Sequence, residues 1–114
     1  MSTAVVLKGD PFSWKAIQAY KIAAALSQKE EVFFIAIKEG VYFFKDWNPE
    51  ALEYENFKTY KVNEKNLKLI ADKDDFTVRG LDKTPLWVKK DNLKLAEEEE
   101  IKELLKRSKI VGVW

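Results

Sequence analysis

The stretch Val32-Phe-Phe-Ile-Ala-Ile37 decides the fold class of this chain of 114 residues. Six consecutive apolar residues, rich in aromatic and β-branched side chains, are typical of a strand buried on both faces, as in a parallel sheet. Ala4 to Leu7 and Leu67 to Ala71 are shorter runs of the same kind. We therefore predict three buried parallel strands at these places.

Segments with helical patterns separate the predicted strands. Apolar residues recur at helical spacing from Trp14 to about Lys29, so a helix is predicted there. Further helices are predicted over 41–47, 72–80 and 97–109, and further strands over 85–88 and 110–114. The polar stretch 49–66 is interpreted as a partly exposed excursion. This alternation predicts a single α/β domain over 1–114, in which helices cover both faces of a mostly parallel sheet of about five strands.

The chain contains neither cysteine nor histidine, which excludes thiol nucleophiles, the usual acyl-transfer triads and the common zinc sites. The 20 Lys and Arg residues nearly balance the 19 Asp and Glu residues, so binding to nucleic acid or to a membrane surface is not expected. No apolar stretch is long enough to span a membrane and no signal peptide is recognisable, so we expect a cytoplasmic protein. The abundance of Lys and Glu favours a thermophilic source.

The loops after the first three predicted strands are the candidate functional region, because ligands of open parallel sheets gather at the carboxyl ends of the strands. Residues of these loops form the predicted ligand-binding set, which is Asp10, Ser13, Trp14, Lys38, Glu39, Asp72 and Lys73. For Asp10, Ser13 and Asp72 the simpler interpretation is that each caps a helix.

A magnesium site is a further interpretation of these loops. Asp10 and Asp72 end neighbouring loops, which resembles the acidic pocket of a receiver domain. A receiver has paired acids after its first strand, whereas this chain has one there. The four glycines are scattered, so no phosphate-binding loop is present. We predict neither a metal nor a cofactor.

An aromatic block follows Gly40, and its members are Tyr42, Phe43, Phe44 and Trp47. Burial in the core is the simplest interpretation of such residues. However, three aromatic residues in succession cannot all point inward from one helix. We therefore expect part of this block to contact another subunit.

Several segments together resemble the DsrE/DsrF/DsrH-like sulfur-relay proteins. Ile37-Lys-Glu-Gly-Val-Tyr42 resembles the segment that follows the second strand of that family. Leu69-Ile-Ala-Asp-Lys-Asp-Asp-Phe-Thr-Val-Arg-Gly-Leu81 is similar to its third strand, short helix and Arg-Gly-Leu ending. Ser108-Lys-Ile-Val-Gly-Val-Trp114 is similar to the last strand of the DsrH/TusB type.

This resemblance implies a flavodoxin-like three-layer α/β fold and assembly into homo-oligomers, or hetero-oligomers with related sulfur-relay subunits. It also implies a role in handling persulfide sulfur. In catalytic DsrE/TusD-type members a cysteine follows the third strand, and that position falls at about Asp72 here. The resemblance is therefore closest to the cysteine-lacking DsrH/TusB type and implies a non-catalytic subunit.

Two alternatives remain from the residues themselves. One is a small-molecule or metal-binding domain that uses the carboxyl ends of the strands, and the other is a hydrolase or transferase that uses carboxylates alone. The excursion over 49–66 is longer than expected of so small a subunit. The chain could therefore also be a diverged member of the DsrE/DsrF/DsrH-like family with a different role.

Overall fold

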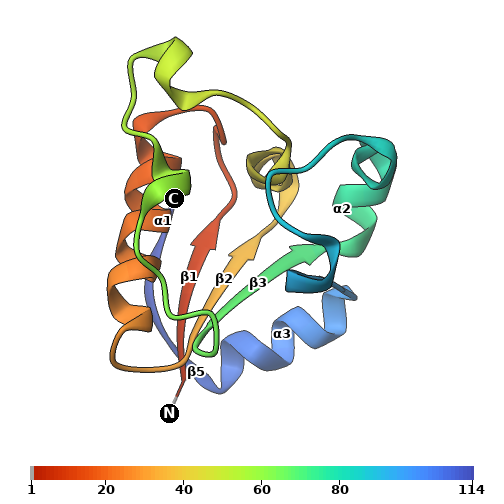
Figure 1. The fold of residues 1–114 in the computed structure, drawn as a ribbon. Coiled ribbons are helices and arrows are strands. Elements are labelled where there is room, and N and C mark those ends of the chain that lie inside the picture. The colour runs from red at the N-terminus through yellow and green to blue at the C-terminus, as the bar shows by residue number, and fades with distance from the viewer. Residues whose placement is uncertain (1) are drawn as a thin grey trace.

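Five parallel strands form the central sheet of the structure, a computed structural model that describes residues 2–114 (Figure 1). The strands are β1 (Ser2–Leu7), β2 (Val32–Ala36), β3 (Leu67–Asp72), β4 (Leu93–Ala96) and β5 (Ser108–Val113). They lie in the order β4-β3-β2-β1-β5, and every neighbouring pair is parallel. The predicted parallel sheet of five strands is thus confirmed.

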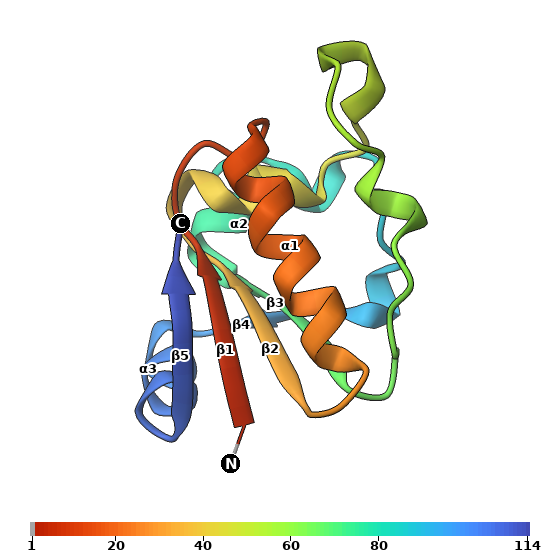
Figure 2. The same ribbon diagram turned by 90° about the vertical axis from the view of Figure 1, so that its left-hand side faces the viewer.

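Helices cover the two faces of this sheet. They are α1 (Trp14–Ser27), α2 (Lys73–Val78) and α3 (Glu98–Lys106). Figure 2 shows α1 and α3 on opposite sides of the strands, which is the three-layer arrangement of the predicted flavodoxin-like fold. No helix within residues 2–114 is both long and apolar enough to cross a membrane.

The buried strands supply both layers of the core, because successive side chains of a strand point to opposite faces of the sheet. Val5 and Phe34 belong to the larger apolar cluster beneath α1. Their chain neighbours Ala4 and Ile35 belong to the smaller cluster against α3. All four side chains are completely buried, as the continuous apolar runs of β1 and β2 predict.

The excursion is anchored to the core by one of its aromatic residues. It contains two 3₁₀ turns, η2 (Pro49–Leu52) and η3 (Phe57–Thr59). The region of η2 projects from the body of the molecule (Figure 1). Phe57 is fully buried, with its ring centre 4.7 Å from that of Phe43 and 5.7 Å from that of Tyr20. The segment therefore covers part of the face on which α1 lies.

The predicted fourth strand is wrong. Residues 85–88 form no strand of the sheet: Leu86 makes only an isolated antiparallel bridge to Lys45, and the Trp87 N–H donates to the Phe44 carbonyl oxygen. The fourth strand is instead Leu93–Ala96. The two middle residues of this strand are exposed because it lies at the sheet edge, so it lacks the continuous apolar run of the inner strands.

Other element boundaries differ by a few residues. The predicted short helix over 41–47 is a 3₁₀ helix, η1 (Lys38–Phe44). The predicted helix over 97–109 ends at Lys106, and the last strand begins at Ser108 instead of Ile110. The short helix after β3 is confirmed, and Gly80 supplies the left-handed residue (φ 70°) that follows it.

Candidate functional site

The loop after β1 holds three of the predicted ligand-binding residues. The Asp10 carboxylate accepts the N–H of Phe12 at 3.0 Å, and the Ser13 hydroxyl donates to the Asp10 carbonyl oxygen at 3.0 Å. Ser13 precedes α1 but makes no capping hydrogen bond, so the predicted capping by these two side chains is wrong. Trp14 follows with 61% of its surface exposed.

Asp72, in contrast, does cap a helix. Its Oδ1 accepts the Asp75 N–H at 2.9 Å at the start of α2. This interaction fixes the direction in which the chain leaves β3. The Nζ of the neighbouring Lys73 lies 3.4 Å from Oε1 of Glu97, which precedes α3. Both partners of that ion pair are more than half exposed, so it contributes little to stability.

Arg79 is the centre of the polar contacts between α2 and η1. Its Nη1 donates to the Asp75 carbonyl oxygen at 2.9 Å and lies 3.5 Å from Oδ1 of the same residue. Its Nη2 lies 3.6 Å from Oε1 of Glu39. Its guanidinium carbon is 5.8 Å from the centre of the Tyr42 ring, within the range of a cation–π contact. The charge of Arg79 is thus balanced inside the chain.

Asp75 belongs to this network but, like Arg79, is absent from the predicted ligand-binding set. Its Oδ2 accepts the backbone N–H of Lys38 at 2.7 Å, where Lys38 has the left-handed φ of 53°. Asp75 therefore joins the loop after β2 to the helix after β3. The only sequence signal was its position in the first turn of α2, which the helix dipole already explains.

The seven predicted residues fall into two groups in the structure. Lys38, Glu39, Asp72 and Lys73 surround the start of α2, whereas Asp10, Ser13 and Trp14 belong to the β1–α1 loop. The two regions touch through Phe12 and Tyr42, whose ring centres are 6.4 Å apart. Within residues 2–114, no three acidic side chains converge in a way that could hold a metal ion.

The network offers little for acid–base chemistry. Asp72 and Asp75 each accept a backbone N–H, and the carboxylate of Glu39 is next to the Arg79 guanidinium. Catalysis by two carboxylates needs a pair whose environments differ and that can reach the same bond. These carboxylates instead hold the loops in place.

The aromatic block divides between core and surface. Phe43 and Phe44 are completely buried, whereas Tyr42 and Trp47 are half-buried. The expected subunit contact therefore does not extend to Phe43 and Phe44, which present no surface. Both can face inward because the segment is a 3₁₀ helix and because η3 and the segment around Trp87 cover it from outside.

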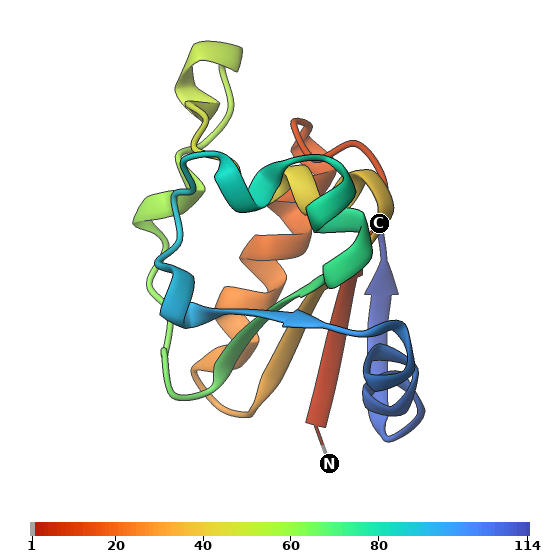
Figure 3. The same cartoon turned by 90° about the vertical axis from the view of Figure 1, so that its right-hand side faces the viewer.

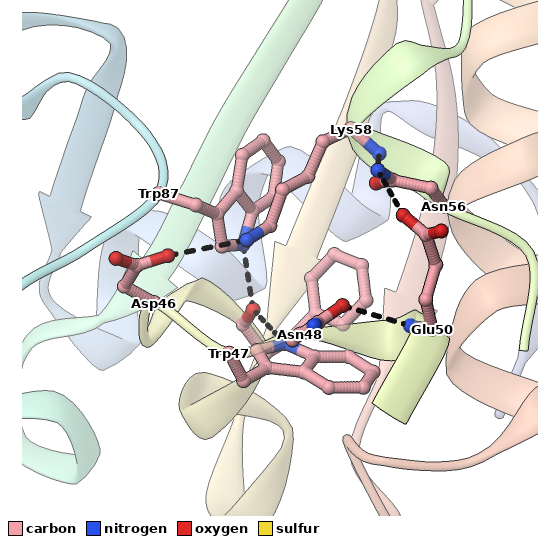
Figure 4. Close-up of polar contacts among 8 residues, drawn as sticks. Asp46, Trp47, Asn48, Glu50, Asn56, Lys58 and Trp87 are labelled. Atoms are coloured by element: carbon pink, nitrogen blue, oxygen red, sulfur yellow. Dashed lines mark hydrogen bonds and ion pairs between the residues drawn. The ribbon is translucent and has the colours of Figure 1, made fainter. Parts of the chain in front are cut away.

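Two tryptophans close over this block. The indole N–H groups of Trp47 and Trp87 both donate to the Phe43 carbonyl oxygen, at 3.1 and 2.7 Å (Figure 4). Lys58 then pairs with Asp46 at 3.1 Å, which ties η3 to the end of the block. These contacts hold the excursion and the segment before β4 on the same face of the sheet.

A cavity of about 670 Å³ opens near these segments, away from the predicted ligand-binding set. Its lining comes from α1, β2, the second half of the excursion, β3, the segment 87–94 and α3. It includes the aromatic side chains Tyr20, Tyr60 and Trp87. No local sequence pattern indicates this cavity, because the lining residues are scattered along the chain.

The outer edge of β5 is the second surface that the sequence analysis missed. Ile110, Val111 and Val113 are 47%, 43% and 52% exposed. β5 is the last strand of the sheet, and no strand of the described chain lies on its outer side. An unpaired edge with apolar side chains is a surface on which another chain can pair.

Comparison with solved structures places this fold beside a known protein. YchN from E. coli matches with a TM-score of 0.71, over 100% of this chain and 99% of that chain, at 17% sequence identity. At this identity the likeness establishes a shared fold over the full length of both chains. No known protein family and no curated protein matches the sequence.

Proposed function

We propose that this chain is a non-catalytic subunit of a DsrE-like assembly that supports intracellular sulfur relay. Three observations support the proposal: the full-length fold likeness to YchN, a protein of the DsrE-like fold, the sequence resemblance described above, and the residue that ends β3, Asp72. The last carries the most weight, since it separates a catalytic member from a non-catalytic one.

The resemblance implies that the position of the cysteine in catalytic members of that family falls at about Asp72. Sulfur relay requires a thiolate that attacks a persulfide and keeps the outer sulfur in a new S–S bond. A carboxylate forms no such bond, and the chain has no cysteine elsewhere. The Asp72 side chain is already used as the cap of α2. The role left for this subunit is to assemble with a partner and position it.

The exposed edge of β5 is the contact surface we assign to this assembly. Its three exposed apolar side chains lie on one six-residue strand. Pairing of a second chain along β5 would satisfy the unpaired backbone groups and bury Ile110 and Val113. This surface takes the place of Phe43 and Phe44, which are buried within the chain.

Measurement of the mass in solution tests this assignment. We expect size-exclusion chromatography with light scattering to show an oligomer, and the double variant Ile110→Lys/Val113→Lys to show a monomer with unchanged circular dichroism. Leu52→Lys is the matched control, since Leu52 is equally apolar and 50% exposed but lies in η2. A wild-type monomer that also captures no DsrE-type subunit would overturn the proposal.

The sulfur-relay role needs a separate test. A persulfide-loaded DsrE-type subunit with a working cysteine is mixed with an acceptor thiol, in the presence and absence of this chain. We expect the chain to change the rate of sulfur transfer and to remain unlabelled when the sulfur is radioactive. Turnover of a sulfur substrate by this chain alone would contradict the proposed role.

A further inference from the structure

The 670 Å³ cavity lies where the sheet is incomplete. β4 pairs with Leu69 to Asp72 only, so the first two residues of β3, Leu67 and Lys68, extend beyond it. The lining includes Leu67 from the α1 face of the sheet and Lys68 from the opposite face. The cavity therefore reaches around the open edge of β3. Figure 3 shows the end of the excursion and the segment before β4 at this edge.

Flat aromatic surfaces form one wall of the cavity. The rings of Tyr20 and Tyr60 are stacked at 18° with their centres 6.3 Å apart. The Trp87 ring meets Tyr20 edge-on at 5.6 Å, and its indole N–H is held by the Phe43 carbonyl oxygen. Because Trp87 is fixed in this way, its ring offers a planar surface that needs no ordering when a ligand binds.

The remaining apolar lining completes a floor for an apolar group. Leu67, Leu69, Val88 and Leu93 are each between 8% and 9% exposed, and all four line the cavity. A volume of this size matches that of ordinary small-molecule sites. The apolar and aromatic lining would therefore hold the ring system of a small ligand.

The charged lining has an excess of cations. It contains five cationic side chains, which are Lys58, Lys68, Lys89, Lys94 and Arg107, against three carboxylates, which are Glu64, Asp91 and Glu100. Lys58 is paired with Asp46 and Lys94 with Glu100. In the described chain, Lys68, Lys89 and Arg107 form no ion pair. Glu64 and Asp91 likewise form no ion pair in the described chain, so the unpaired side chains of the lining keep an excess of one positive charge, which is available to an anionic group.

We propose that this cavity binds a small planar aromatic anion, whose ring packs against Tyr60 and Trp87 and whose anionic group is held by Lys68 or Lys89. The inference does not depend on the proposed sulfur-relay function, because the cavity is separate from both Asp72 and the β5 edge. Aromatic stacking selects a planar ring, and the excess of cations in the lining favours an anion over a neutral molecule of the same shape.

Two fluorescent probes of similar ring structure test both parts of the inference. One is 8-anilinonaphthalene-1-sulfonate, an anion with a planar naphthalene ring, and the other is N-phenyl-1-naphthylamine, its neutral counterpart. We expect the anion to bind at least about tenfold more tightly than the neutral probe, since the cations contribute only to the former. Equal affinity of the two probes would overturn the assignment of an anion.

Variants then locate the binding site. The double variant Lys68→Glu/Lys89→Glu should bind the anionic probe about tenfold more weakly than the wild type. Its affinity for the neutral probe should be unchanged. The variant Val62→Trp places a large ring in the lining, so it should lower the affinity for both probes. Lys29→Glu is the matched control, because Lys29 is exposed and lies outside the cavity. Unchanged binding of the anionic probe in Lys68→Glu/Lys89→Glu would refute the proposed site.

Two further measurements distinguish the cavity from the apolar edge of β5. Ile110→Lys/Val113→Lys should retain binding of the anionic probe, and its loss in that variant would assign the probe to β5 and overturn the proposal. In nuclear magnetic resonance spectra, the indole N–H signal of Trp87 should shift on titration while that of exposed Trp14 stays in place. A Trp14 shift without a Trp87 shift would also overturn it.

Discussion

Gly40 packs directly against the backbone of Leu7, the last residue of β1. A Cβ atom on Gly40 would stand 2.8 Å from the Leu7 carbonyl carbon and closer still to its oxygen. That oxygen also accepts the N–H of Ile37 at 2.9 Å. The start of η1 therefore lies on the end of β1 with no room for a side chain, which sets the position of the whole aromatic block.

Gly40→Ala should lower the free energy of unfolding by about 2–3 kcal/mol, because the added methyl group meets main-chain atoms that cannot turn aside. Urea unfolding followed by circular dichroism measures this loss. Gly9→Ala is the control: a Cβ there would lie 3.7 Å from its nearest neighbour, in ordinary contact, and should change little. Equal effects of the two substitutions would show that Gly40 is not closely packed.

Ser27 should be among the most sensitive polar positions of the core. Its hydroxyl donates to the Ala24 carbonyl oxygen at 2.6 Å and accepts the Asn63 N–H at 3.1 Å, while the side chain is completely buried. Ser27→Ala leaves the partly buried Asn63 N–H without its partner, so we expect a loss of about 1 kcal/mol. Hydrogen exchange at the Asn63 amide should accelerate at the same time. Unchanged exchange there would mean that the hydroxyl does not hold the loop before β3.

Asp75 should matter more than its exposed neighbour Asp74. Asp75→Ala removes the acceptor of the Lys38 N–H and one partner of Arg79. We expect this variant to lose about 1–3 kcal/mol of unfolding free energy. Asp74→Ala, in the same turn of α2 but without these contacts, should stay within about 0.5 kcal/mol of the wild type. Thermal unfolding of the two variants side by side provides the comparison.

The stability of the fold should fall at alkaline pH. Burial, assisted by the Glu64 carboxylate, raises the pKa of the Tyr20 phenol to about 12. Burial and the nearby Glu55 also raise the pKa of Tyr60. In the unfolded chain a tyrosine ionises at about pH 10. The protonated phenols therefore contribute fully to the free energy of unfolding below about pH 10. This contribution is lost as the pH rises through the pKa of the folded state.

Urea unfolding at about pH 9 and about pH 11 checks this dependence. The Tyr20→Phe variant keeps the ring in the core but has no proton to lose, so its stability should fall less over the same range. If the wild type and Tyr20→Phe lose stability equally, the phenol of Tyr20 ionises as freely in the folded chain as in the unfolded one.

Prediction from the sequence succeeded where a structure follows from local pattern. The inner strands β1, β2 and β3 are continuous apolar runs because both of their faces are covered, and such runs are visible without any tertiary information. The Asp72 cap and the Gly80 turn are local as well. These features together determine the parallel sheet and the helix after each strand.

Prediction from the sequence failed where the structure of a segment depends on contacts with residues far away in the chain. Leu93–Ala96 forms a strand because it lies beside β3, whereas 85–88 has a similar composition but packs against the aromatic block. Phe43 and Phe44 are buried only because η3 and Trp87 cover them. The cavity and the Asp75–Lys38 contact join segments that are far apart in the chain, so no local pattern could reveal them.

The pairing of β5 with β1 has a consequence for the order in which the chain folds. Ser2 to Val6 of β1 lie beside Ser108 to Val113 of β5, so β1 must wait until β5, the last strand of this sheet in chain order, has been synthesised. Until then one edge of β1 stays open to neighbouring nascent chains, and closing so long a loop is slow. The yield of folded protein during expression should therefore depend on temperature and on the concentration of nascent chains. This dependence should be stronger than the stability of the finished sheet would suggest.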